Sequence, residues 1–184
     1  MKAPGPMRTS RLIFLAVLLM FVVPGCSGLS GSGSTASSIG PELKQNHRFT
    51  LMNPQNEAVS LDRLLTKNKS VLINFWATWC GFCVEEMPDL VKLQARFEGQ
   101  GFTILAVNVG ESPAQASAFA KRMGLNFPIV LDEDNTVAEN YGLVGIPVSY
   151  LVSSEGKVLG EYHGFNKKMV TDVEDSLKES AVEK

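Results

Sequence analysis

The sequence predicts an α/β fold: a mixed central sheet with helices on both faces and a β-hairpin added on the N-terminal side. Two apolar runs of strand length, VLINFWA and FTILAVNV, lack polar alternation, as strands buried on both faces do. A helix-like pattern follows each run. Two further strand-like segments are joined by a short turn, and a last helical pattern closes the chain. Strands that alternate with helices and end in a hairpin indicate a mixed sheet.

The first elements are short. Residues 47–53 and 57–61 have strand composition around the turn sequence NPQNE. Ser60 then precedes the helical pattern of residues 61–65, as an N-cap would. The first buried strand covers residues 71–77, and the helix after it runs from about residue 80 to residue 97.

The second half repeats this alternation. A Ser-Pro start and a Gly stop frame the expected helix after the second buried strand. The expected elements are a strand at 102–109, a helix at 112–124, a short strand at 127–132, a helix at about 135–141, strands at 147–153 and 157–164, and a helix from 167 to about 180.

The composition is that of an ordinary globular chain. It has 184 residues, 45% of them hydrophobic and 20% charged, with a net charge of -2. This length suits one domain with a real core, and the charge gives no reason to expect nucleic acid as a partner. The three cysteines, Cys26, Cys80 and Cys83, are too few for a disulfide-stapled scaffold.

The N-terminal segment has the pattern of an export signal. Basic residues precede the apolar run of residues 12–23, which suits a signal peptide and is too short to span a bilayer comfortably. The following VPGCSG resembles a bacterial lipoprotein signal. That resemblance implies a signal peptide at residues 1–25 and a lipid on Cys26, which would become the mature N-terminus and the membrane anchor.

The alternative is an ordinary signal peptide cleaved near Ala36, with Cys26 discarded. Either reading places the mature domain outside the cytoplasm, facing the periplasm if the cell has an outer membrane, where disulfides persist. Residues 26–40 are rich in Gly and Ser and predict a flexible tether. The folded domain is expected at residues 41–184.

Cys80 and Cys83 form a Cys-x-x-Cys pair between a buried strand and a helix. A disulfide across so few residues would restrict the unfolded chain little. A zinc site would need further ligands, and the only histidines, His47 and His163, are distant from the pair in the sequence. At a helix N-terminus the backbone N–H groups and the dipole favour a thiolate. We therefore expect Cys80 to be the nucleophile and Cys83, one turn further in, to be the resolving cysteine.

The stretch FWATWCGFC resembles the active site of thioredoxin-fold proteins. More narrowly, WATWCxxCxxEMP resembles the extracytoplasmic branch typified by TlpA and ResA, and the similarity covers residues 41–184. It implies a thioredoxin-like fold and a membrane-tethered thiol–disulfide oxidoreductase. It also implies that Pro147 forms a cis bond with Ile146 in a loop that faces the dithiol and binds substrate.

The resemblance further implies a reductase of protein disulfides, with apocytochrome c as an example of a client and a membrane thiol carrier as electron donor. We expect no cofactor beyond the Cys80–Cys83 disulfide, no metal, and a monomer. The remaining alternatives are a disulfide oxidase or isomerase, a thiol peroxidase, and a non-catalytic lipoprotein that only docks partners. Cys80 lacks the Pro-x-x-x-Thr/Ser-x-x-Cys arrangement of the peroxidases.

Three further features would tune the site. Asn74 occupies the position where many thioredoxins carry an aspartate, and an amide cannot transfer a proton. Glu86 lies three residues after Cys83 on the expected helix and is the candidate proton relay. Phe82 stands where relatives often have proline. We expect its N–H, near Cys80, to favour the thiolate and so to raise the reduction potential. We expect Trp79, Gly81, Phe82 and Ile146 to join Pro147 in binding substrate.

Overall fold

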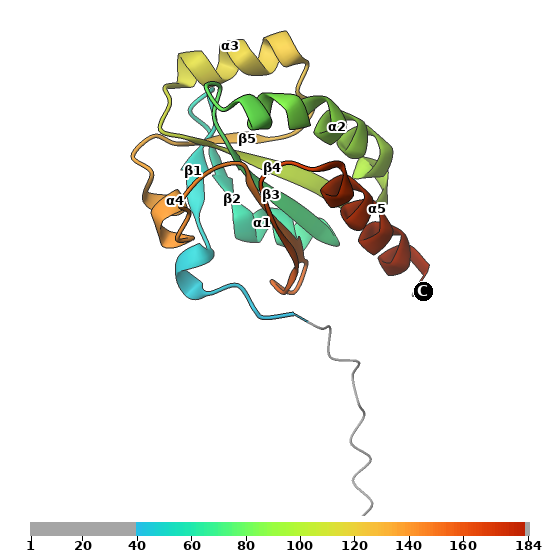
Figure 1. The fold of residues 1–184 in the computed structure, drawn as a ribbon. Helices are drawn as coiled ribbons and strands as arrows, with labels where there is room; N and C mark the ends of the chain where they lie inside the picture. Colours follow the sequence, from blue (N-terminus) through green and yellow to red (C-terminus); the bar gives the residue numbers. More distant parts are fainter. Residues whose placement is uncertain (1–39, 183–184) are drawn as a thin grey trace, which may run out of the picture. The chain divides into compact units, whose positions relative to one another are not determined.

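Seven strands form one mixed sheet in the order β2-β1-β5-β4-β3-β6-β7. The computed structural model describes residues 40–182, and the arrangement is drawn in Figure 1. The strands are β1 (Thr50–Met52), β2 (Ala58–Ser60), β3 (Ser70–Trp76), β4 (Phe102–Val109), β5 (Ile129–Asp132), β6 (Val148–Ser153) and β7 (Val158–His163). The helices are α1 (Leu61–Lys67), α2 (Gly81–Phe97), α3 (Pro113–Met123), α4 (Thr136–Asn140) and α5 (Lys167–Val182), with short 3-10 turns at Gln45–His47 and Glu98–Gln100.

Strands β3, β4 and β5 are parallel, whereas β6 runs antiparallel to β3 and β1 antiparallel to β5. Every residue of β3 is buried, as its unbroken apolar run predicts. The predicted α/β architecture, a mixed sheet with helices on both faces, is confirmed. One local difference is that residues 45–47 form a 3-10 turn, which shortens the first predicted strand to Thr50–Met52.

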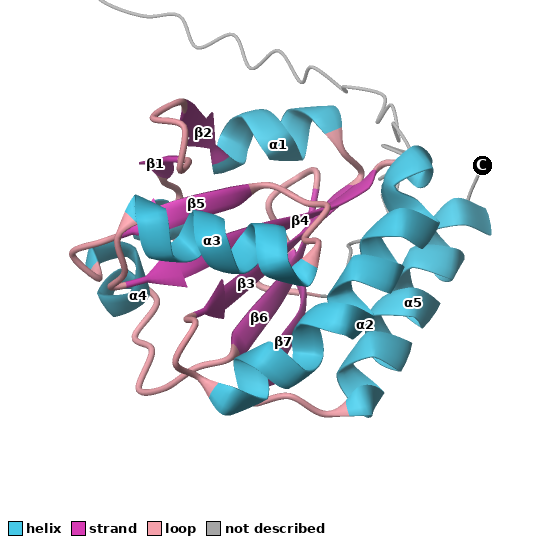
Figure 2. Ribbon diagram, turned by 90° about the horizontal axis from the view of Figure 1, so that it is seen from above, coloured by secondary structure: helices cyan, strands magenta, loops and turns pink. Residues whose placement is uncertain are grey.

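Side chains of alternate residues on the central strands enter two separate cores. On one face Leu72, Trp76 and Ile104 pack with residues of α2, α3 and α5; on the other, Val71 and Phe75 pack with residues of α1 and α4. The helices thus lie on opposite sides of the sheet, as Figure 1 shows. In Figure 2, α2 and α5 lie side by side, and an ion pair between Arg96 and Glu174 joins them. The start of α2 packs in the first of these cores, together with residues of β3, α3 and α5.

The predicted signal peptide at residues 1–25, the lipidation site Cys26 and nearly all of the predicted tether lie outside the described residues. Between residues 40 and 182, no helix has both the length and the apolar character needed to span a membrane. Residues 41–43 already pair with the start of β7, through backbone hydrogen bonds of Pro41 with Val158 and of Leu43 with Gly156.

Candidate active site

The Cys-x-x-Cys pair lies at the start of α2, just after the short loop that follows β3. Cys80 is the N-cap of α2, and its Sγ accepts a hydrogen bond from the N–H of Cys83 at 3.2 Å. The two sulfurs are joined in a disulfide, with the Cα atoms 5.2 Å apart. Cys80 is 7% exposed and Cys83 is fully covered. Cys83 therefore has no surface open to solvent, whereas Cys80 keeps a small exposed fraction.

The loop before β6 lies beside this disulfide because β6 pairs antiparallel with β3, so that Val148 lies opposite Phe75. The Ile146–Pro147 peptide bond in this loop is cis. The carbonyl oxygen of Ile146 lies 3.6 Å from Sγ of Cys80. Residues separated by more than 60 positions thus meet at the reactive sulfur.

A buried polar cluster lies under the pair. Asn74 of β3 donates through Nδ2 to Oε1 of Glu86 at 2.8 Å and to Oγ of Ser149 at 3.0 Å. Glu86 is 1% exposed, whereas its neighbour Glu85 is exposed. Oε2 of Glu86 and Oδ1 of Asn74 have no hydrogen-bond partner among the described residues.

Burial raises the pKa of Glu86 from 4.5 to about 7, against a smaller lowering by the hydrogen bond from Asn74. A carboxyl group with this pKa exchanges its proton near neutral pH, as a proton relay must. Its sequence position puts it one helical turn after Cys83 and on the same side of α2.

A second buried carboxyl group, Glu111, was not found by sequence reasoning. It follows β4 and is 6% exposed. Its Oε2 accepts from the backbone N–H of Thr78 at 2.8 Å and from Nδ2 of Asn108 at 2.7 Å, and its Oε1 accepts from Oγ1 of Thr78 at 2.5 Å. The only sequence signal is an acidic residue directly after a buried strand, which is weak by itself.

Comparison with known proteins bears on this site. The model of the AhpC/TSA family matches residues 43–160. The chain belongs to the AhpC/TSA family. It is 37% identical over 131 residues to the thiol-disulfide oxidoreductase ResA of Bacillus subtilis, covering 71% of this chain and 72% of that protein. A ResA of Bacillus thuringiensis subsp. konkukian is 28% identical over 173 residues, covering 94% and 98%. The chain is a thiol–disulfide oxidoreductase.

Solved structures agree with this assignment. A DsbE thiol:disulfide interchange protein of Chlorobium tepidum has a TM-score of 0.67 at 28% identity, covering 77% of this chain and 96% of that one. A thiol:disulfide interchange protein of Bacteroides sp. has a TM-score of 0.66 at 27% identity, covering 76% and 90%.

The surface around the disulfide of this oxidoreductase is apolar. Trp79 is 71% exposed and Phe82 is 65% exposed, and Val144 beyond them is fully exposed. A pocket of about 390 Å³ is lined by Trp79 and Ile146 together with Val109, Asn135, Ala138, Glu139, Leu143 and Gly145. A side chain at position 81 would meet no atom within 4 Å, so Gly81 is not required for space. The N–H that reaches Sγ of Cys80 belongs to Cys83, not to Phe82.

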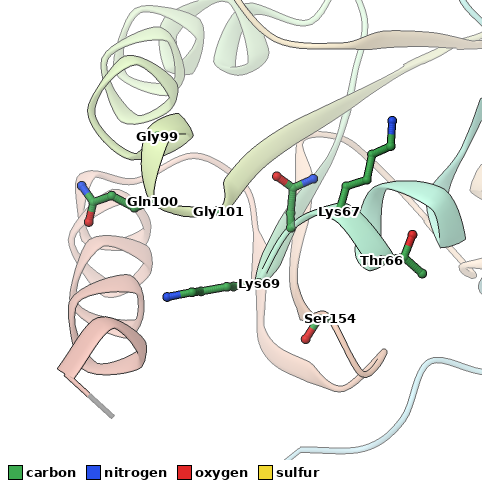
Figure 3. A pocket seen from close by; sticks show the side chains of 8 residues that line it. Thr66, Lys67, Lys69, Gly99, Gln100, Gly101 and Ser154 are labelled. Atoms are coloured by element: carbon green, nitrogen blue, oxygen red, sulfur yellow. The ribbon is translucent and has the colours of Figure 1, made fainter. Parts of the chain in front are cut away.

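Other polar features lie elsewhere. No cluster of three His, Cys, Asp or Glu side chains able to hold a metal is found between residues 40 and 182. The ring of His47 stacks on Tyr141 at 4.1 Å, and His163 lies beside Glu161. A pocket of about 520 Å³ is lined by residues from the loops around Lys69, Gly101 and Ser154. In Figure 3, Lys67 and Lys69 point in different directions, so their charges do not converge on one anion.

Proposed function

We propose that the protein is a membrane-tethered, extracytoplasmic reductase of protein disulfides in which Cys80 attacks and Cys83 resolves. The observation that carries the proposal is the pairing, at the start of α2, of a slightly exposed Cys80 at the N-cap with a fully covered Cys83. The N–H of Cys83 and the helix dipole both stabilise a thiolate on Cys80. Because Cys83 is covered, it reacts only with a sulfur already attached to Cys80.

In the reducing direction, the Cys80 thiolate attacks one sulfur of a client disulfide. The client S–S bond breaks, and its other sulfur leaves as a thiolate and takes up a proton. Glu86 removes the proton from Cys83, whose thiolate attacks Sγ of Cys80. The mixed disulfide breaks, and the second client sulfur leaves and is protonated. The client gains two electrons and two protons. Cys80 and Cys83 supply both electrons and form the disulfide; one proton comes from Cys83 through Glu86 and the other from solvent, because Cys80 starts as a thiolate.

The apolar surface defines where a client docks. Trp79 and Phe82 expose large rings beside Cys80, and Ile146 presents its carbonyl next to the sulfur. With Gly81 and Pro147 they form the substrate-binding surface. An extended client backbone can donate to such a carbonyl as a strand does at a sheet edge.

The proposed location, clients and electron donor are supported by the N-terminal sequence and by the resemblance to ResA. A lipid on Cys26 and the segment of residues 26–40 hold the domain at a membrane, outside the cytoplasm. Clients are extracytoplasmic proteins with cysteines, of which apocytochrome c is an example. A membrane thiol carrier returns the enzyme to the dithiol state, since the surroundings are oxidising. The enzyme works as a monomer, and the Cys80–Cys83 pair is its only redox group.

The reduction potential of the purified protein in graded thiol–disulfide buffers tests the direction of the reaction, with Cys80→Ser as control. A value at or below about -250 mV supports a reductase, whereas a value above about -180 mV indicates an oxidase or isomerase. A chain that only docks partners would keep its cellular phenotype in Cys80→Ser, and the absence of a reversible Cys80–Cys83 couple would contradict the enzyme mechanism.

A further inference from the structure

Thr78 lies two residues before Cys80 and is held by a carboxylate from another part of the fold. Both its backbone N–H and its hydroxyl donate to Glu111, at 2.8 Å and 2.5 Å. Thr78 itself is half-buried, and its partner is 33 residues further along the chain. These two hydrogen bonds therefore link the loop between β3 and α2 to the residues that follow β4.

Glu111 is itself held in position by a residue of β4 and by the turn that follows this strand. Nδ2 of Asn108 in β4 donates to Oε2 of Glu111 at 2.7 Å, and Asn108 pairs in register with Trp76, the last residue of β3. Gly110 has a φ of 70°, and a Cβ there would lie 2.9 Å from Oδ1 of Asn135. Only glycine suits this turn, which directs Glu111 back toward the β3–α2 loop.

The side chain of Glu111 receives hydrogen bonds and donates none among the contacts of the described residues. All three donors aim at its carboxylate oxygens, so it acts as an acceptor only. No ion pair of residues 40–182 includes it within salt-bridge distance. Hydrogen bonds from neutral groups replace the water that a buried carboxylate loses.

The loop between Thr78 and Cys80 is short and closes through a backbone hydrogen bond from Cys80 to Ala77 at 3.3 Å. A displacement of Thr78 therefore moves the N-cap sulfur relative to the N–H of Cys83. We propose that Glu111 is a positioning residue for Cys80, which holds the β3–α2 loop so that Sγ stays at the N-cap of α2. The proposal rests on the role of Cys80 as the attacking cysteine.

The test measures alkylation of Cys80 by iodoacetamide in the fully reduced full-length protein as a function of pH. The alkylated residue is identified by peptide mapping. Glu111→Ala removes all three contacts, so the alkylation rate at pH 7 should fall about tenfold and the pKa of the Cys80 thiol should rise. Glu111→Gln removes the charge and keeps the contacts. Its Oε1 can accept both N–H groups, and its Nε2 can donate to the Thr78 hydroxyl. We expect its rate and thiol pKa within about twofold and a few tenths of a unit of the wild type.

Gln94→Ala is the matched control. Oε1 of Gln94, also buried, accepts from the backbone N–H of Ile104 at 2.8 Å at the far end of α2. This variant also leaves a buried backbone N–H without its acceptor. Equal slowing in Gln94→Ala and Glu111→Ala would overturn the proposal, because the effect would then follow from general destabilisation. An unchanged rate in Glu111→Ala would also overturn it.

A third result distinguishes position from charge. If Glu111→Gln shifts the thiol pKa as far as Glu111→Ala does, the charge acts on Cys80 and the proposal fails. If Glu111→Ala does not fold, Thr78→Val removes the hydroxyl contact alone and should slow alkylation about threefold. No slowing in Thr78→Val would then overturn the proposal. Mapping of the first label to Cys83 in the wild type would contradict the proposed function itself, whatever the Glu111 variants do.

Discussion

Glu86 and Glu111 are both buried carboxyl groups that flank the Cys-x-x-Cys segment, and their surroundings differ. Glu86 accepts one hydrogen bond, from Asn74, and its Oε2 has no partner among the described residues. Glu111 accepts three, and both of its oxygens are used. Glu86 belongs to the helix that carries the cysteines, whereas Glu111 comes from the end of β4.

The difference shows that burial alone does not give a carboxyl group its role. With one donor, burial dominates and the pKa of Glu86 rises to about 7. With three donors, the lost hydration of Glu111 is replaced by neutral hydrogen-bonding groups. We therefore assign proton transfer to Glu86 and positioning to Glu111.

The largest expected effect is on the pH dependence of the free energy of unfolding of the oxidised protein. Below about pH 4.5 both the folded and the unfolded chain hold the Glu86 proton. As pH rises toward 7 the unfolded chain loses this proton first, so the free energy of unfolding falls by about 3 kcal/mol through this window and stays lower above it.

Denaturant unfolding at pH 4.5 and pH 8.5 measures this fall, and the difference between wild type and Glu86→Gln isolates it. His47, whose pKa is lowered mainly by burial, acts in the opposite direction and cancels in that difference. An equal loss of stability in both proteins over this range would mean that Glu86 does not titrate as the structure indicates.

The next effect is on the resolving step. Glu86→Gln keeps the acceptor for Asn74 but cannot take a proton from Cys83, so the attack of Cys83 on the mixed disulfide should slow about a hundredfold. Rapid quenching in acid, followed by mass spectrometry, should show that the mixed disulfide accumulates. Glu85→Gln, next to it and exposed, is the matched control. If both variants resolve the mixed disulfide at the wild-type rate, Glu86 is not the relay.

How much of this site follows from the sequence depends on the distance over which each contact acts. The position of Cys80 at the N-cap of α2 follows from local signals, an apolar run and a helical pattern, and the structure places it there. Glu86 follows from helical spacing. These inferences need only neighbouring residues.

The contacts between separate elements could not be predicted. Asn74 was recognised only as a residue unable to transfer protons, whereas the structure makes it the hydrogen-bond donor of Glu86. Glu111 reaches Thr78 only because the parallel strands β3 and β4 end at the same edge of the sheet. The cis bond at Pro147 was expected from the family resemblance alone. Strand order and register decide such contacts, and neither is written in a local pattern.

Asn74→Ala tests the hydrogen bond to Glu86, which is the smaller of the two influences on the pKa of this carboxyl group. Removal of the hydrogen bond takes away the group that lowers the pKa of Glu86, so this pKa should rise by about one unit. The limb of the pH–rate profile for the resolving step should move upward by the same amount. Ser149→Ala, which removes the second acceptor of Asn74, should move it less. A downward shift of this limb in Asn74→Ala would contradict the hydrogen bond from Asn74 to Glu86.

Phe82→Pro should have the smallest effect and serves as the reference for both glutamates. The sequence suggested that the N–H of Phe82 favours the thiolate, but the donor to Sγ of Cys80 is the N–H of Cys83, which proline at 82 leaves in place. The Phe82 ring is 65% exposed, and proline is tolerated in the first turn of a helix. We expect the reduction potential to change by less than about 15 mV, or about threefold in the exchange equilibrium. If Phe82→Pro changes the reduction potential more than Glu86→Gln does, the dipeptide between the cysteines controls the potential. The buried carboxyl groups would then set only the rate and the position of the reacting sulfur.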